Sequence, residues 1–96
     1  EFDDVFEVAV RMYPNDKIAN LNAANSAMHK RDLESAKEYL KRAGDSAEAV
    51  YARGAYAAMI EDYDTARKLF KQAESKGLAQ ATAALAELEV FINKQK

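Results

Sequence analysis

The chain has 96 residues, the size of one domain, and its 14 Lys and Arg against 16 Asp and Glu give a net charge of −2. Such a balance argues against a protein that coats nucleic acid, and the lack of cysteine excludes disulfides and thiolate metal sites. Alanine supplies 20 residues, whereas Gly occurs three times and Pro once. Because alanine is the strongest helix former and both breakers are rare, the composition predicts an all-α fold.

Helical periodicity and break signals predict six helices. Apolar residues recur at i, i+3/4 and i+7, and polar turns separate these stretches. Asn15 or Asp16, and later Ser46, stand where an N-cap is needed. Because the intervening loops are short, consecutive helices should be antiparallel neighbours. The expected helices span residues 3–12, 16–29, 32–43, 47–60, 63–75 and 79–93.

Two stretches of the chain repeat with a period of 30 residues. The first helix has the pattern of the second helix of such a unit, so we expect the sequence to be a piece of a longer chain. Repeats of this length are usually helix pairs that bury their apolar faces by stacking. The aligned pairs are Ala24 with Gly54, Asp32 with Asp62, Leu33 with Tyr63, Ala36 with Ala66, Leu40 with Phe70 and Ala43 with Ala73.

The same alignment predicts which side chains form the core. Small residues should let neighbouring helices approach closely, and Gly54 and Ala66 should tolerate enlargement least. The expected core residues are Phe6, Ala9, Ala24, Leu33, Ala36, Leu40, Gly54, Tyr63, Ala66, Phe70, Ala73, Leu85 and Leu88.

These repeats resemble the tetratricopeptide (TPR) family, whose units are helix pairs of 34 residues. The family places small residues at repeat positions 8, 20 and 27, an aromatic at 24 and Pro at 32. The matching residues here are Ala24, Ala36, Leu40 and Ala43, then Gly54, Ala66, Phe70 and Ala73, with Phe6, Ala9 and Pro14 in a leading half-unit. The stretch from Tyr63 to Leu85 is similar to a Sel1-type repeat. The family has a large aromatic at repeat position 4, where this chain has Asn20 in one unit and Val50 in the other.

The resemblance implies an α-α superhelix, a TPR-like solenoid, within a single domain. In the family, the first helix of each pair lines a concave groove through positions 2, 5, 9 and 12. Its parts here would be a half-repeat at 1–14, repeats at 17–46 and 47–78, and a closing helix at 79–93. The implied groove residues are Ile18, Leu21, Asn25 and Met28 from one unit and Glu48, Tyr51, Ala55 and Ala58 from the next.

Within this groove, Tyr51 and Leu21 are the anchors we expect, because tyrosine and other large side chains carry much of the affinity of interfaces. Asn22 or Asn25 could hydrogen-bond a peptide backbone. The alternative is that Leu21, Met28 and Tyr51 only pack between helices, and the sequence leaves this open.

The function we expect is a non-catalytic scaffold that binds a protein or peptide partner, with no cofactor, metal or nucleic acid and no membrane insertion. His29, the single histidine, ends a helix where a cation favours the dipole, and no nucleophile pairs with it. The alternative is a structural spacer or self-assembly element of a longer cell-envelope protein, such as a homodimer. It would cover the apolar face around Val5, Phe6, Val8 and Ala9. The stretches 13–16, 20–24, 43–46 and 51–54 are more loosely similar to the repeat tails of bacterial outer-membrane-associated proteins. This similarity implies the cell envelope or periplasm, with the cytoplasm as the alternative.

Overall fold

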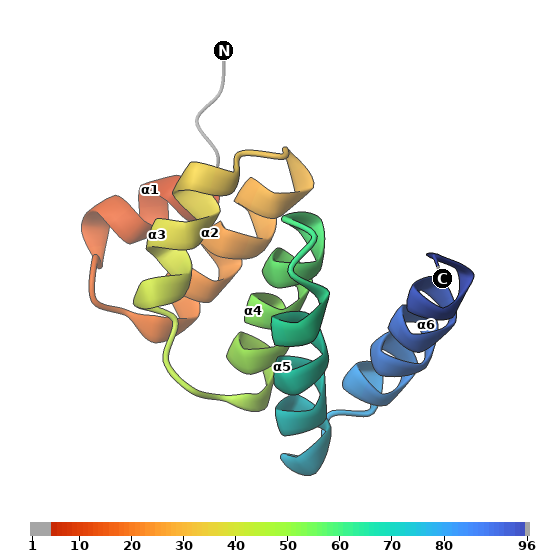
Figure 1. Cartoon of the computed structure of the whole chain (residues 1–96). Helices are drawn as coiled ribbons and strands as arrows, with labels where there is room; N and C mark the ends of the chain where they lie inside the picture. The colour runs from red at the N-terminus through yellow and green to blue at the C-terminus, as the bar shows by residue number, and fades with distance from the viewer. Residues whose placement is uncertain (1–4, 96) are drawn as a thin grey trace. The chain divides into compact units, whose positions relative to one another are not determined.

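The computed structural model describes residues 5–95, and over that range the chain forms six α-helices and no β-strand, which confirms the all-α prediction. The described helix boundaries lie within two residues of those expected, and positions 3 and 4 of the first expected helix lie outside the described residues. The helices are α1 (Val5–Met12), α2 (Lys17–His29), α3 (Leu33–Lys41), α4 (Ala47–Met59), α5 (Tyr63–Ser75) and α6 (Ala79–Gln95) (Figure 1).

Four of the helices, α2 to α5, begin at a side-chain N-cap. The caps are Asp16, Asp32, Ser46 and Asp62, and each accepts a hydrogen bond from the backbone N–H three residues later. Each cap satisfies one of the N–H groups that a helix start leaves unpaired, which is worth about 1 kcal/mol. Asp16 rather than Asn15 therefore caps α2, and Ser46 caps α4 as the sequence predicts.

The turns that close the pairs α2–α3 and α4–α5 have the same geometry. Arg31 and Glu61 take φ values of 65° and 64°, in the left-handed region that non-glycine residues rarely adopt. The next residue, Asp32 or Asp62, donates its backbone N–H at 2.8 Å to the carbonyl five residues earlier. This bond pairs a carbonyl at the end of the first helix, so the 30-residue alignment holds for the turn geometry as well as for the sequence.

The chain divides into two compact units, Glu1–Gly44 (the N-terminal unit) and Asp45–Lys96 (the C-terminal unit). In the N-terminal unit α2 packs against both α1 and α3. An ion pair also joins Glu7 of α1 to Lys30 at the end of α2, with 3.8 Å between the charged atoms. The buried apolar side chains of this unit are mostly small: Val10, Ala23, Ala24, Ala27, Met28, Ala36, Leu40 and Ala43.

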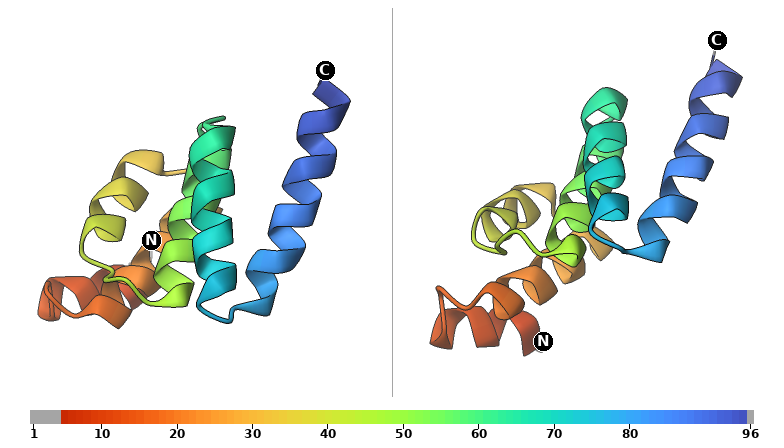
Figure 2. Two further views of the ribbon diagram at one scale, coloured as in Figure 1. Left: turned by 60° about the horizontal axis from the view of Figure 1, so that its bottom comes forward. Right: turned by 90° about the horizontal axis from the view of Figure 1, so that it is seen from below.

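In the C-terminal unit α5 packs against both α4 and α6. Figure 2 shows α4 and α5 side by side, with α6 standing off from α4 in both views. Arg67 of α5 forms an ion pair with Glu89 of α6, which ties the last helix to its neighbour. The buried core of this unit includes larger side chains than the first: Ala49, Val50, Ala52, Ala57, Ala66, Phe70, Ala73, Ala81 and Leu88.

The core predictions are wrong at Phe6, which is 42% exposed, whereas Val10 is the buried residue of α1. Among the described helices α1 packs mainly on α2, so only a narrow stripe of it is covered. Four more residues expected in the core are only partly buried: Ala9, Leu33, Tyr63 and Leu85. Asn20, which stands where the resembled family has an aromatic, is fully buried.

Candidate binding groove

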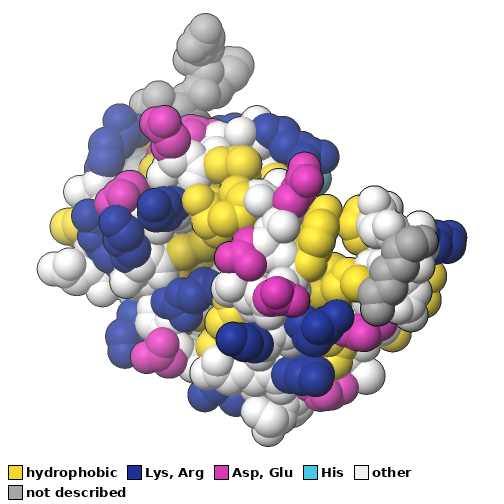
Figure 3. Space-filling view, in the orientation of Figure 1, with side chains coloured by type: hydrophobic (Ala, Val, Ile, Leu, Met, Phe, Trp, Pro, Cys, Tyr) yellow, Lys and Arg dark blue, Asp and Glu magenta, His cyan; other side chains and the backbone are white. Residues whose placement is uncertain are grey.

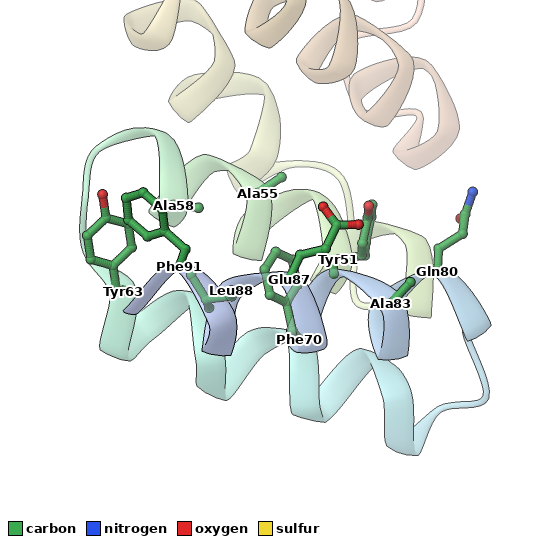
Figure 4. A pocket seen from close by; sticks show the side chains of 11 residues that line it. Tyr51, Ala55, Ala58, Tyr63, Phe70, Gln80, Ala83, Glu87, Leu88 and Phe91 are labelled. Atoms are coloured by element: carbon green, nitrogen blue, oxygen red, sulfur yellow. The ribbon is translucent and has the colours of Figure 1, made fainter. Parts of the chain in front are cut away.

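A groove of about 600 Å³ lies in the C-terminal unit between α4 and α6, with α5 at its base. Figure 3 shows hydrophobic side chains gathered between the α4–α5 pair and α6. The groove is lined by Tyr51, Ala55, Ala58, Tyr63, Phe70, Gln80, Ala83, Ala84, Glu87, Leu88 and Phe91 (Figure 4).

The groove stays open because its two walls carry small side chains. Ala55 and Ala58 face it from α4, and Ala83 and Ala84 face it from α6. Leu88 is buried against the cluster around Phe70 and, together with the Arg67–Glu89 ion pair, holds α6 on α5 rather than on α4. The methyl groups of these alanines are too small to fill the space between α4 and α6.

Two aromatic pairs stand along the groove. Tyr51 of α4 and Phe70 of α5 have ring centroids 5.5 Å apart with planes tilted by 40°. Tyr63 of α5 and Phe91 of α6 meet edge to face with centroids 5.3 Å apart. Both separations are in the favourable range for aromatic pairs, so the rings hold one another in place. Phe91 is nevertheless 42% exposed, which leaves aromatic surface available at the edge of the groove.

The charge of the groove comes from Glu87 alone among its described lining residues. The side chain is exposed and makes no hydrogen bond or ion pair within residues 5–95. In Figure 4 it reaches from α6 toward the side of the groove where Tyr51 lies. The basic residues of α5, Arg67, Lys68 and Lys71, are not part of the lining. The groove therefore offers an apolar base with one unpaired carboxylate.

The structure brings together only some of the residues that the resemblance assigns to a groove. Tyr51, Ala55 and Ala58 line it, whereas Glu48 lies one turn earlier on α4 and is exposed outside it. Tyr51 also packs on Phe70, which is one of the two roles that the sequence left open, and its role as a binding anchor stays a prediction. The residues assigned on α2 belong to the N-terminal unit and none lines this groove: Ile18, Asn22 and Asn25 are exposed, Leu21 is half-buried and Met28 is buried.

The α6 wall of the groove was not predicted from the sequence. A signal for it was present: counting the family's positions 2, 5, 9 and 12 from residue 79 gives Gln80, Ala83, Glu87 and Val90, of which the first three line the groove. Phe70, Tyr63 and Leu88 were expected in the core, and they form the base and ends of the groove as well.

Outside the groove, the outer face of α3 carries an exposed ion pair. The Lys41 ammonium hydrogen-bonds the Glu38 carboxylate at 3.0 Å and lowers the pKa of Glu38 below its ordinary value. Over the described residues, no group of three or more His, Asp or Glu side chains is arranged to hold a metal ion. None of the helices in that range combines the length and apolarity that a membrane span requires. Comparison with protein-family models, curated proteins and solved structures found no match to this chain.

Proposed function

We propose that this chain is a non-catalytic protein-interaction module that binds a segment of another protein in the groove between α4 and α6. The observation that carries the proposal is the open hollow of about 600 Å³ with aromatic rings along it. Its volume falls within the range of ligand-binding clefts, and exposed aromatic surface such as that of Phe91 is typical of interaction sites.

We further propose that the helix pairs are TPR-like repeats. The identical turns at Arg31 and Glu61 and the matched capping residues Asp32 and Asp62 support this assignment. The groove supports the assignment too, because its walls are α4 and α6. These would be the first helices of successive repeats, and the family binds partners with its first helices.

Affinity in this groove would come from a few anchors. An apolar side chain of a partner that enters between the two aromatic pairs leaves water and contacts Phe70, Leu88 and the wall alanines. Full burial of such a side chain contributes about 1.5–3 kcal/mol to the binding free energy. Tyr51 offers ring surface together with a hydroxyl at the groove wall, a combination common at interface hot spots.

The experiment that tests the proposal uses a random peptide library displayed on phage as the probe. Peptides selected on the immobilised chain are measured by fluorescence anisotropy against Tyr51→Ala, which should weaken binding at least about tenfold while far-UV circular dichroism stays unchanged. Tyr56→Ala is the matched control, because Tyr56 lies on the same helix but not in the groove lining. Selected peptides whose affinity is unaffected by both Tyr51→Ala and Phe91→Ala would show that the groove is not the binding site.

A second candidate function, self-assembly, is favoured by the apolar surface of α1. Val5 and Met12 are 76% and 64% exposed, and Val8 is exposed as well. Light scattering over a range of concentrations separates the two candidates. A dimer that Met12→Glu dissociates supports assembly through α1, whereas a monomer that still binds selected peptides supports the groove.

A further inference from the structure

The chemistry of the groove indicates what kind of segment fits it. Its walls are the sides of two helices, whose backbone groups are already paired within each helix. The lining offers few other hydrogen-bonding groups: the Tyr51 and Tyr63 hydroxyls, Gln80 and Glu87. An extended segment would have to pair those of its backbone groups that face the groove with these few side chains. A helical segment satisfies its own backbone and needs only side-chain contacts, so the lining favours a helix.

The spacing of the aromatic pairs agrees with a helical occupant. Tyr63 and Phe70 are seven residues apart on α5, which is a rise of about 10.5 Å, and each belongs to one of the two pairs. Residues i and i+7 of a bound helix have the same separation, so each can contact one pair. The residue at i+3 or i+4 then faces Leu88 and Ala58, between the pairs.

The charge of the occupant follows from Glu87. Its carboxylate is the one charge among the described lining residues and has no partner within the same range. An acidic segment would bring like charges together in the groove, whereas a Lys or Arg would pair with Glu87. The faces of Tyr51 and Phe91 add attraction for a cation that reaches them.

We infer that the groove binds an amphipathic helix whose apolar stripe lies on the two aromatic pairs and whose Lys or Arg side chains, beside that stripe, pair with Glu87. This inference rests on the proposed function, since it names the partner chemistry of the same groove.

The test uses two fluorescein-labelled helical peptides and the whole chain. Both peptides carry Leu at i, i+3, i+4 and i+7, one with Lys beside the Leu stripe and the other with Glu at the same positions. Anisotropy titrations should give tighter binding of the Lys peptide, with an affinity that falls as salt is raised. Glu87→Gln should weaken the Lys peptide about fivefold, and Glu87→Lys should reverse the preference between the peptides.

Glu74→Lys is the matched control, because Glu74 is an exposed residue of α5 outside the groove lining. It changes the net charge by as much as Glu87→Lys, so a preference that reverses in both variants would show general attraction and overturn the inference. Equal binding of the two peptides that Tyr51→Ala abolishes would overturn the inference and leave the proposed function in place. If neither peptide binds and library selection enriches no sequence, both fail.

Discussion

The pairs α2–α3 and α4–α5 share their caps and their turn but fill the space between their helices differently. Ala24 and Leu40 of the first pair align with Gly54 and Phe70 of the second. At Gly54 an added Cβ would lie 2.7 Å from two ring atoms of Phe70, so the glycine leaves room for the ring. The first pair has an alanine where the second has this glycine, and a smaller leucine where the second has the ring. The two helix pairs therefore keep the same turn geometry although one side chain is smaller and the other larger in the second pair.

The larger side chain at position 70 takes part in two features of the C-terminal unit. Phe70 is 4% exposed, yet it belongs to both the core cluster of the C-terminal unit and the base of the groove. In the N-terminal unit the aligned residue Leu40 is buried as well, but it has no ring. At this position, therefore, only the second pair has an aromatic side chain that belongs both to the core and to the base of a groove.

The largest expected effect comes from removal of this ring. Phe70→Ala should lower the free energy of unfolding by about 3–5 kcal/mol, because it removes the largest buried side chain of its cluster and leaves a cavity. Small domains have a free energy of unfolding of only about 5–15 kcal/mol, so the variant should lose a large fraction of its stability. Urea titration followed by circular dichroism measures the loss. Leu40→Ala is the matched variant, and a larger loss there would contradict the greater weight we give to the second pair.

A second difference between the pairs lies at the start of their first helices. The buried Asn20 amide donates hydrogen bonds to the carbonyls of Pro14 and Asp16 at 3.0 and 2.8 Å, and its Oδ1 has no partner among the described atoms. The aligned residue Val50 packs in an apolar cluster with Ala73 instead. The asparagine side chain therefore hydrogen-bonds α2 to the loop before it, whereas the start of α4 is held by the apolar contacts of Val50.

Exchange of these two residues should lower the free energy of unfolding more in the second pair than in the first. Asn20→Val leaves the Pro14 carbonyl unpaired but also removes the unpaired Oδ1, so we expect a loss of about 1 kcal/mol. Val50→Asn buries an amide among apolar side chains and should cost about 2–3 kcal/mol. Urea midpoints of the two variants, compared at equal m-values, measure the difference. A stabilised Asn20→Val would show that the two hydrogen bonds do not hold the loop.

The sequence predicts well those features that depend on neighbouring residues. Helix starts follow from capping side chains such as Asp16 and Ser46, which the sequence already places before the expected helices. These interactions span three to five residues, so they are visible in a single stretch of sequence.

The groove was harder to predict, because it depends on where α6 lies. The ion pair between Arg67 and Glu89 joins residues 22 positions apart, and helical periodicity says nothing about such a contact. The repeat alignment also placed Phe6 in the core, although the neighbouring helix covers Val10 instead. The extent to which a helix face is covered depends on its partners, which the helix's own sequence does not specify.

The smallest expected effect is also the most direct test of the exchange between the pairs. Gly54→Ala improves helix propensity by about 1 kcal/mol but forces the Phe70 ring to move against Tyr51, which should cost about 1–3 kcal/mol. We expect a net loss of about 1 kcal/mol, measured by urea denaturation. In the Phe70→Leu background, which reproduces the side chains of the first pair, the clash is absent and Gly54→Ala should stabilise by up to about 1 kcal/mol. The effect of Gly54→Ala on the free energy of unfolding should change sign between the two backgrounds only if the Phe70 ring is what requires glycine at this position. Equal losses in both backgrounds would mean that another neighbour, such as Leu69, restricts the site.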